Sequence, residues 1–153
     1  MILESPIGTL RIATDEAGRL TRVHFVKHPE ELLAHEEKAS DAAHVVAQLR
    51  EYFAGERRTF DLELAPQGTP FQLAVWNALC EIPYGDTVTY AELARRIGRP
   101  NAVRAVGAAN GANPIPVIVP CHRVIGSNGT LTGYGGGIDR KQFLLALEGR
   151  RLF

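Results

Sequence analysis

Hydrophobic and polar positions alternate along parts of the first sixty residues and recur at helical spacing along others. Alternation and β-branched content predict strands, and apolar positions three and four residues apart predict helices. The expected strands cover 9–14, 20–26 and 59–64, and the expected helices cover 29–38 and 42–53. Gly18 punctuates the first two strands, which are therefore expected to form an antiparallel meander. Residues 1–65 are predicted to be a small α/β domain.

A linker at 65–68 separates this domain from residues 69–153, which are predicted to form a mainly helical second domain. Thr69 opens its first helix as the N-cap, followed by proline at N1 and glutamine at N3. An apolar stripe along this helix indicates a side that packs into a core. Cys80 lies beside the stripe and is expected to be a buried, inert thiol. The predicted fold class is α+β.

Two short helices with a glycine-containing turn follow and predict a helix-turn-helix. The first begins with a capping box at Thr89, Gly98 ends it, and Asn101 is expected to cap the second helix over 102–110. The second helix carries one long side chain among small ones, at Arg104, Ala102, Ala105 and Ala109. Such a face is unsuited to reading base edges in the major groove, but it can approach a narrow groove closely. Close packing between helices is the alternative interpretation.

Cys121 is the candidate reactive residue of the second domain. Residues 117–119 are predicted to be a short buried strand that runs into the segment 120–125. A cysteine nucleophile needs a nearby base or a positive field. His122 can be that base, through a water, provided that the backbone turns, because neighbouring residues on a strand point to opposite faces.

Groups that support this pair are expected further along the chain. Glu148, near the end of a helix predicted over 139–148, is the best downstream carboxylate to hold the histidine. Arg104 and Arg123 would add positive potential. The glycine-rich stretch around Tyr134 offers backbone N–H groups and an aromatic ring to a ligand, although a flexible surface loop has the same composition.

Charge is unevenly distributed although the net charge is zero. Residues 1–84 contain 8 Lys/Arg and 13 Asp/Glu, whereas residues 85–153 contain 9 and 4. A basic second half favours a polyanionic partner such as nucleic acid. No apolar run suits a bilayer, the first residues do not resemble a secretion signal, and two thiols fit a reducing cytoplasm. The histidines of the first domain lack accompanying ligands, so neither a metal nor a cofactor is expected.

The second domain resembles the O6-alkylguanine-DNA alkyltransferase family, the methylated-DNA–protein-cysteine methyltransferases, in five features: Arg104–Gly107, Asn113-Pro114, Pro120–Val124, Tyr134 and Glu148. The resemblance is strong over 69–149, and the length and order of the first domain also fit. It implies a ribonuclease H-like first domain and DNA repair by one irreversible transfer of an alkyl group to a protein cysteine. The substrates implied are O6-alkylguanine and also O4-alkylthymine. A monomer would bind double-stranded DNA through the minor groove, without a membrane and without a cofactor.

The resemblance also implies roles for individual residues. Cys121 would accept the alkyl group, His122 would deprotonate it through a water, and Glu148 would polarise His122. Asn113 would be the hinge between the second helix of the helix-turn-helix and the active-site turn. Tyr90 would press on the target phosphate, help to rotate the nucleotide and protonate the leaving guanine at N3.

Contacts to DNA and to the flipped base are implied in the same way. Arg104 would replace the flipped base, and the DNA-contacting residues would be Arg104, Ala102, Ala105, Ala109 and Arg123. Carbonyl groups of Cys121 and Val124 would bind the guanine exocyclic amine. The base pocket would also contain Tyr134 and Gly135. Gly135 stands where some relatives have serine, so it keeps the backbone N–H toward O6 but loses a hydroxyl, which bears on substrate breadth.

Two other interpretations of the sequence are retained. A non-catalytic module that binds DNA lesions has no need of Cys121 and His122 beside Glu148. A cysteine hydrolase that uses Cys121 and His122 needs an oxyanion hole and leaves the helix-turn-helix unexplained.

Overall fold

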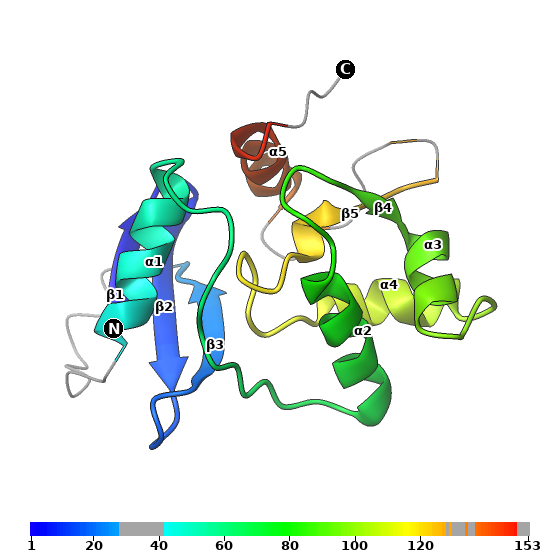
Figure 1. The fold of residues 1–153 in the computed structure, drawn as a ribbon, viewed down its shortest axis with the longest axis horizontal. Coiled ribbons are helices and arrows are strands. Elements are labelled where there is room, and N and C mark those ends of the chain that lie inside the picture. Colours follow the sequence, from blue (N-terminus) through cyan, green and yellow to red (C-terminus); the bar gives the residue numbers. More distant parts are fainter. Residues whose placement is uncertain (28–41, 128, 130–133, 135–136, 150–153) are drawn as a thin grey trace. The chain divides into compact units, whose positions relative to one another are not determined.

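The computed structural model describes residues 1–27, 42–127, 129, 134 and 137–149 (Figure 1). The chain divides into two compact units, Met1–Pro66 and Gln67–Phe153. Among the described residues, no helix has the length and apolarity needed to span a bilayer.

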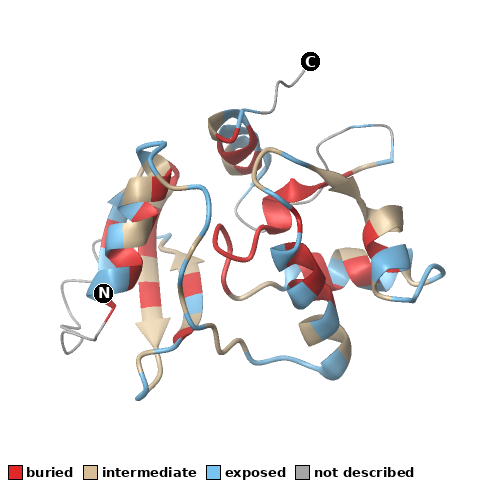
Figure 2. Ribbon diagram, viewed as in Figure 1, coloured by how far each residue is buried: buried red, intermediate tan, exposed pale blue. Residues whose placement is uncertain are grey.

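The first unit is a three-stranded antiparallel sheet accompanied by one helix. Its elements are β1 (Ile2–Ser5), β2 (Gly8–Thr14), β3 (Leu20–Phe25) and α1 (Ala43–Phe53). The strands pair in the order β1-β2-β3, which confirms the predicted meander and adds β1 to it. Leu10 and Ile12 of the central strand and Leu49 of α1 are fully buried and belong to the core of this unit (Figure 2).

The strand predicted over 59–64 is wrong: a helix side chain bonds the middle of this segment, and only its end pairs with the sheet. The Gln48 side-chain amide donates to the Asp61 carbonyl oxygen at 3.0 Å and accepts from the Asp61 N–H at 2.9 Å. Within 59–64, bridging to the sheet is limited to Leu64, which pairs with Leu20. The helix predicted over 29–38 lies outside the described residues.

Helices dominate the second unit. Its elements are α2 (Pro70–Cys80), β4 (Val88–Thr89), α3 (Tyr90–Arg96), α4 (Val103–Gly111), the 3₁₀ turn η2 (Cys121–Arg123), β5 (Val124–Ile125) and α5 (Ile138–Leu147). The predicted capping box is confirmed: the Thr69 side chain accepts from the Gln72 N–H at 3.1 Å, and the Gln72 side chain accepts from the Thr69 N–H at 2.9 Å. This reciprocal pair satisfies two of the N–H groups that a helix start leaves open.

The helix-turn-helix is formed by α3 and α4, which pack against each other and against α2. Gly98 adopts a φ of +74°, a left-handed conformation that suits glycine and ends α3. The N-cap of α4 is Ala102, without a side-chain hydrogen bond, so the prediction of Asn101 as cap is wrong. On the buried side of α4, the Ala109 carbonyl oxygen accepts from the Trp76 indole N–H at 2.8 Å.

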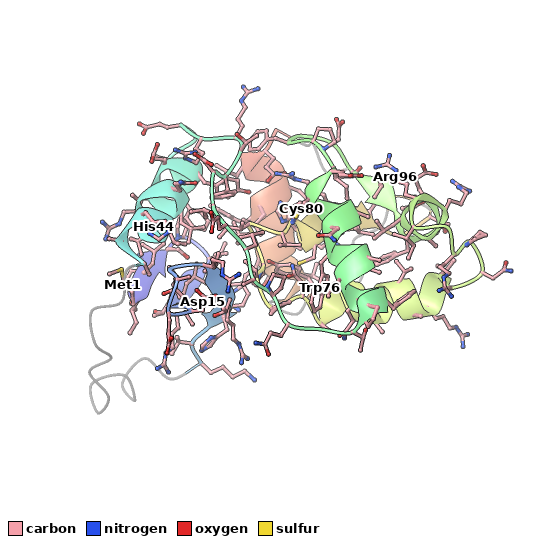
Figure 3. All side chains as sticks on the ribbon, turned by 60° about the horizontal axis from the view of Figure 1, so that its bottom comes forward. Met1, Asp15, His44, Trp76, Cys80 and Arg96 are labelled. Carbon is pink, nitrogen blue, oxygen red and sulfur yellow. The ribbon has the colours of Figure 1, made fainter. Side chains whose placement is uncertain are left out.

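Cys80 is exposed at the last residue of α2, so the prediction that it is buried is wrong (Figure 3). The buried side of this helix runs instead through Val75, Trp76, Ala78 and Leu79. Helix α2 therefore packs Trp76 into the core and turns its final residue to the surface.

A short parallel pair connects the helix-turn-helix with the reactive segment. Val88 of β4 pairs with Val124 of β5, and Thr89 pairs with Ile125. Strand β4 leads directly into α3, and β5 follows directly after η2. The pairing therefore brings the start of α3 close to the turn that carries Cys121.

Candidate active site

The segment before Cys121 is a tight turn rather than the strand predicted over 117–119. The Val119 N–H donates to the Ile115 carbonyl oxygen at 2.9 Å, and Val117 has a φ of +73°, which is strained for a β-branched residue. The Asn113 side chain holds this turn from inside: its amide donates to the Val119 carbonyl oxygen at 2.8 Å, and its oxygen accepts from the Ile115 N–H at 2.9 Å. These side-chain bonds replace the ladder bonds that a strand would need.

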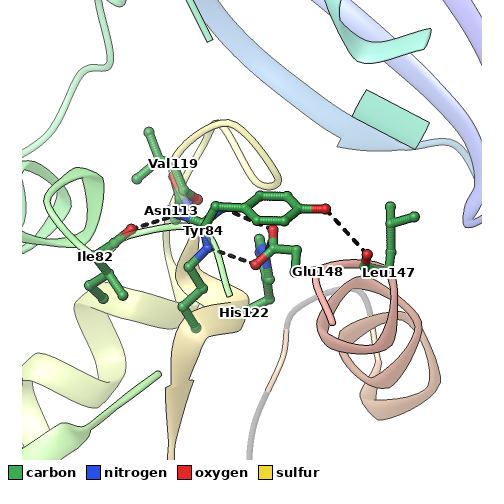
Figure 4. Close-up of polar contacts among 8 residues, drawn as sticks. Ile82, Tyr84, Asn113, Val119, His122, Leu147 and Glu148 are labelled. Atoms are coloured by element: carbon green, nitrogen blue, oxygen red, sulfur yellow. Dashed lines mark hydrogen bonds and ion pairs between the residues drawn. The ribbon is translucent and has the colours of Figure 1, made fainter. Parts of the chain in front are cut away.

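The turn continues into η2 and places Cys121 and His122 in the interior, 4% and 0% exposed. His122 Nε2 lies 2.8 Å from Glu148 Oε2 (Figure 4). Because an ionised carboxylate only accepts hydrogen bonds, Nε2 carries the ring proton and Nδ1 keeps a lone pair. Nδ1 is buried and has no hydrogen-bond partner among the described residues. His122 is thus arranged as a base.

Burial lowers the pKa of His122 and outweighs the hydrogen bond and negative charge of Glu148, which raise it. The ring is therefore neutral at neutral pH, which is the state that can accept a proton.

Arg123 is buried and neutralises Glu148, so its predicted contact with DNA is wrong. Its Nε donates to Glu148 Oε1 at 2.8 Å and its Nη2 donates to Glu148 Oε2 at 2.9 Å. Its Nη1 donates to the Ile82 carbonyl oxygen at 2.7 Å, and its guanidinium carbon lies 5.7 Å from the centre of the Tyr84 ring. Such a two-pronged contact fixes the carboxylate that faces His122 (Figure 4).

The Cys121 thiol is protonated in the resting protein. Burial raises its pKa to about 11, against a hydrogen bond from Asn113 and the positive charge of Lys141, both of which lower it. A buried thiol of this kind needs a base to remove its proton at the moment of reaction.

Lys141 is a site residue that the sequence reasoning missed. Its side chain is fully buried, its Nζ donates to the Val124 carbonyl oxygen, and Nζ lies 5.9 Å from the centre of the Tyr90 ring. Burial lowers the pKa of Lys141 to about 8, although the Cys121 charge raises it. The position of Lys141 in the sequence was a detectable signal of its burial, because it lies at helical spacing from apolar residues that face the core. The buried positions of α5 and its C-cap are Lys141, Leu144, Leu145 and Glu148.

Asn110 was also missed and is 2% exposed. Its Nδ2 donates to the Cys121 carbonyl oxygen at 3.3 Å. It too lies on a buried stripe at helical spacing, which runs through Val106, Ala109 and Asn110 of α4. A polar residue on an apolar helical stripe was the signal in both cases.

The two tyrosines named from the sequence lie near this centre. Tyr90 is the first residue of α3 and faces Lys141. Burial and the charge of Cys121 raise the pKa of Tyr134 well above its ordinary value, and this electrostatic influence indicates proximity to Cys121. Gly135 lies outside the described residues.

The predicted DNA-facing residues of α4 divide between two sides of the helix. Arg104 and Ala105 are exposed and Ala102 is half-buried. Ala109 is 3% exposed and packs inward, so its predicted DNA contact is wrong; Ala108 is exposed instead. In the parts of the chain that the structure describes, no cluster of three His, Cys, Asp or Glu side chains could hold a metal ion.

Comparisons with known proteins identify relatives of both units. Residues 70–150 match the family described as "6-O-methylguanine DNA methyltransferase, DNA binding domain", and residues 1–66 match its "ribonuclease-like domain". A methylated-DNA–protein-cysteine methyltransferase of Methanosarcina acetivorans is 56% identical over 97% of this chain and 96% of its own length.

Solved structures give the same result. A crystal structure of the Mycobacterium tuberculosis O6-methylguanine methyltransferase has a TM-score of 0.85 and 50% identity, covering 96% of this chain and 90% of that one. A second M. tuberculosis structure, of OGT in complex with DNA, has a TM-score of 0.83 and 48% identity, covering the same shares.

Replacing Lys141 by methionine should slow S-alkylation of Cys121 by iodoacetamide. Loss of the positive charge leaves the pKa of Cys121 higher, so we expect the rate at about pH 7 to fall roughly three- to tenfold. The effect should shrink above the Lys141 pKa of about 8, because the wild-type lysine then loses its charge as well. Peptide mass spectrometry at about pH 7 and about pH 9.5 measures both rates.

Cys80 is the internal control for this experiment, since the charged neighbours that act on it are Arg123 and Glu81. An equal loss of rate at Cys80 and Cys121 would indicate a general change of structure. An unchanged rate at Cys121 would contradict the electrostatic role of Lys141.

Proposed function

Because the chain belongs to the 6-O-methylguanine DNA methyltransferase family, we propose that it repairs DNA by moving the alkyl group of O6-alkylguanine onto its own Cys121. The observation that carries the proposal is the buried His122–Glu148 pair, which leaves Nδ1 bare on the residue next to a buried thiol. A helix-turn-helix in the same unit supplies the surface for DNA.

The reaction begins with removal of the Cys121 proton. His122 Nδ1 takes this proton, through a water that spans the two neighbouring side chains, and Glu148 stabilises the imidazolium that forms. Lys141 and Asn113 stabilise the sulfur anion. Because burial raises the pKa of Cys121 to about 11, the thiol stays protonated in the free protein, which protects it from oxidation.

The thiolate then attacks the alkyl carbon in line with its bond to O6. A carbon–sulfur bond forms, the carbon–oxygen bond breaks, and the electron pair stays with the base. Tyr90 protonates the leaving guanine at N3 and is left as a phenolate, while His122 holds the proton from Cys121. Proton exchange through solvent then returns Tyr90 and His122 to their starting states, so that the proton lost by Cys121 balances the proton gained by the base. The thioether product has no good leaving group, and each molecule therefore reacts once.

DNA binding is assigned to the exposed side of α4. Arg104, Ala105 and Ala108 lie on this side. The small alanines on either side of one arginine suit close approach to a minor groove. Arg104 fills the stack after the target nucleotide rotates out, which any chemistry on a buried base requires. A monomer suffices for this contact. The M. tuberculosis relative solved in complex with DNA supports DNA binding by this fold.

Cys121→Ser should abolish transfer and leave DNA binding intact, because a serine alkoxide is much harder to form than a thiolate. Intact-protein mass spectrometry after incubation with O6-methylguanine duplex, and a binding titration, measure the two properties. Cys80→Ser is the matched control and should transfer at the wild-type rate.

Residual transfer by Cys121→Ser near the wild-type rate would refute the assignment of the nucleophile. If the wild-type protein binds the lesion but gains no mass, the alternative of a non-catalytic lesion-binding module is correct.

Arg104→Ala should slow repair of duplex DNA by about tenfold or more and leave repair of the free base nearly unchanged. The arginine acts only when a base must leave the stack, and unstacking costs a few kcal/mol. Single-turnover rates on O6-methylguanine duplex and on free O6-methylguanine provide the comparison. Equal slowing on both substrates would mean that Arg104 acts on the chemistry or on folding.

Methylation of Cys121 should destabilise the protein. The thiol is 4% exposed in a tight turn, and an added methyl group in a packed site typically costs ~1–3 kcal/mol. Shifting the turn at Cys121 to make room for the methyl group would also disturb Asn113, which lies just after α4. The methylated form should therefore release DNA more readily. Melting curves before and after stoichiometric methylation should show a midpoint lower by a few degrees. A midpoint that stays equal or rises would show that the site has room for the methyl group.

A further inference from the structure

The turn between α2 and β4, residues 82–86, packs closely against the end of α5. Its Asp86 N–H donates to the Pro83 carbonyl oxygen at 3.0 Å, and Gly85 has a φ of +86°, as the third position of a type II turn requires. A Cβ atom at Gly85 would lie 3.3 Å from the Glu148 carbonyl oxygen. Glycine therefore allows this turn to approach the residue that holds the base.

Tyr84 is the second residue of the turn and joins α5 to Arg123 (Figure 4). Its hydroxyl donates to the carbonyl oxygen of Leu147, the last residue of α5, at 3.2 Å. The Arg123 guanidinium carbon lies 5.7 Å from the centre of the Tyr84 ring, within the range in which a ring face attracts a cation. Arg123 Nη1 also donates to the Ile82 carbonyl oxygen at 2.7 Å. The turn thus contacts Arg123 through its backbone and through its tyrosine.

The position of Arg123 matters for His122. Burial lowers the pKa of His122 most, the charges of Arg123 and Lys141 lower it further, and Glu148 raises it. The thiol of Cys121 beside it is uncharged in the resting protein. Arg123 acts twice, because its own charge opposes a proton on His122 and its two bonds to Glu148 offset the charge of the carboxylate. An arginine that moved away would therefore raise the pKa of His122.

We infer that Tyr84 is a positioning residue that holds Arg123 against Glu148 and thereby keeps His122 ready to accept the proton of Cys121. This inference rests on the proposed function, since it gives Tyr84 a part in the same proton transfer. An arginine side chain loses rotamer freedom when it is fixed, and a ring face that attracts its planar guanidinium offsets part of that loss. The hydroxyl bond to α5 keeps the ring in its place.

Single-turnover transfer from an O6-methylguanine duplex, measured between about pH 5 and pH 8, tests the inference. Transfer needs neutral His122, so its rate falls as the pH drops through the His122 pKa. Tyr84→Leu raises this pKa by releasing Arg123, so we expect a rate about three- to tenfold lower on the acid side and within about twofold of wild type at the upper end. Tyr84→Phe keeps the ring and loses only the bond to Leu147, so the loss on the acid side should be about twofold. Phe143→Leu, which removes an exposed ring from α5, should keep the wild-type profile.

Nitrogen-15 NMR follows the titration of His122 in the same proteins without DNA, and Tyr84→Leu should gain the second ring proton at a higher pH than wild type. If Tyr84→Leu slows transfer equally at every pH or leaves it unchanged, Tyr84 only supports the structure and the inference is wrong. If Tyr84→Leu does not fold, Tyr84→Phe decides, because a wild-type profile in that variant overturns the inference. A wild-type protein that transfers nothing refutes the proposed function instead, and the NMR titration then decides the inference: equal titration of His122 in wild type and in Tyr84→Leu overturns it.

Discussion

The contact of Glu148 with both His122 and Arg123 is the interaction on which the site depends. A buried carboxylate at the C-terminal end of α5 is doubly unfavourable, since it is desolvated and faces the negative end of the helix dipole. The two-pronged contact of Arg123 offsets this cost and cancels the charge. His122 can then stay neutral while Glu148 still dictates which nitrogen carries the proton.

Helix α5 and helix α4 meet at the nucleophile through buried polar groups. The inward side of α5 carries Lys141 and leads to Glu148, so one helix supplies both a positive charge near the sulfur and the partner of the base. From α4, Asn110 contacts the Cys121 backbone, and the following Asn113 holds the turn. The helix assigned to DNA is therefore connected to the chemistry by two amide side chains.

Local signals in the sequence predicted the parts of the fold that local chemistry controls. The capping box at Thr69 and the stop at Gly98 depend on neighbouring residues, and the structure contains both. The turn at 117–119 escaped prediction, because its valines favour a strand and only the Asn113 side chain, with burial, overrides them. Arg123 was assigned to the surface because its partner, Glu148, lies 25 residues away in the chain. Which polar residues enter the core is thus decided by tertiary contacts.

The central claim is that burial keeps His122 neutral, while Glu148 holds the ring proton on Nε2 and so leaves Nδ1 bare. Nitrogen-15 NMR of the histidine side chains tests this claim most directly, because ring nitrogens with and without a proton resonate far apart. Comparison with a His122→Gln variant assigns the His122 signals. At neutral pH the account predicts one protonated nitrogen, Nε2, and one bare nitrogen, Nδ1. A proton on Nδ1, or on both nitrogens, would contradict it.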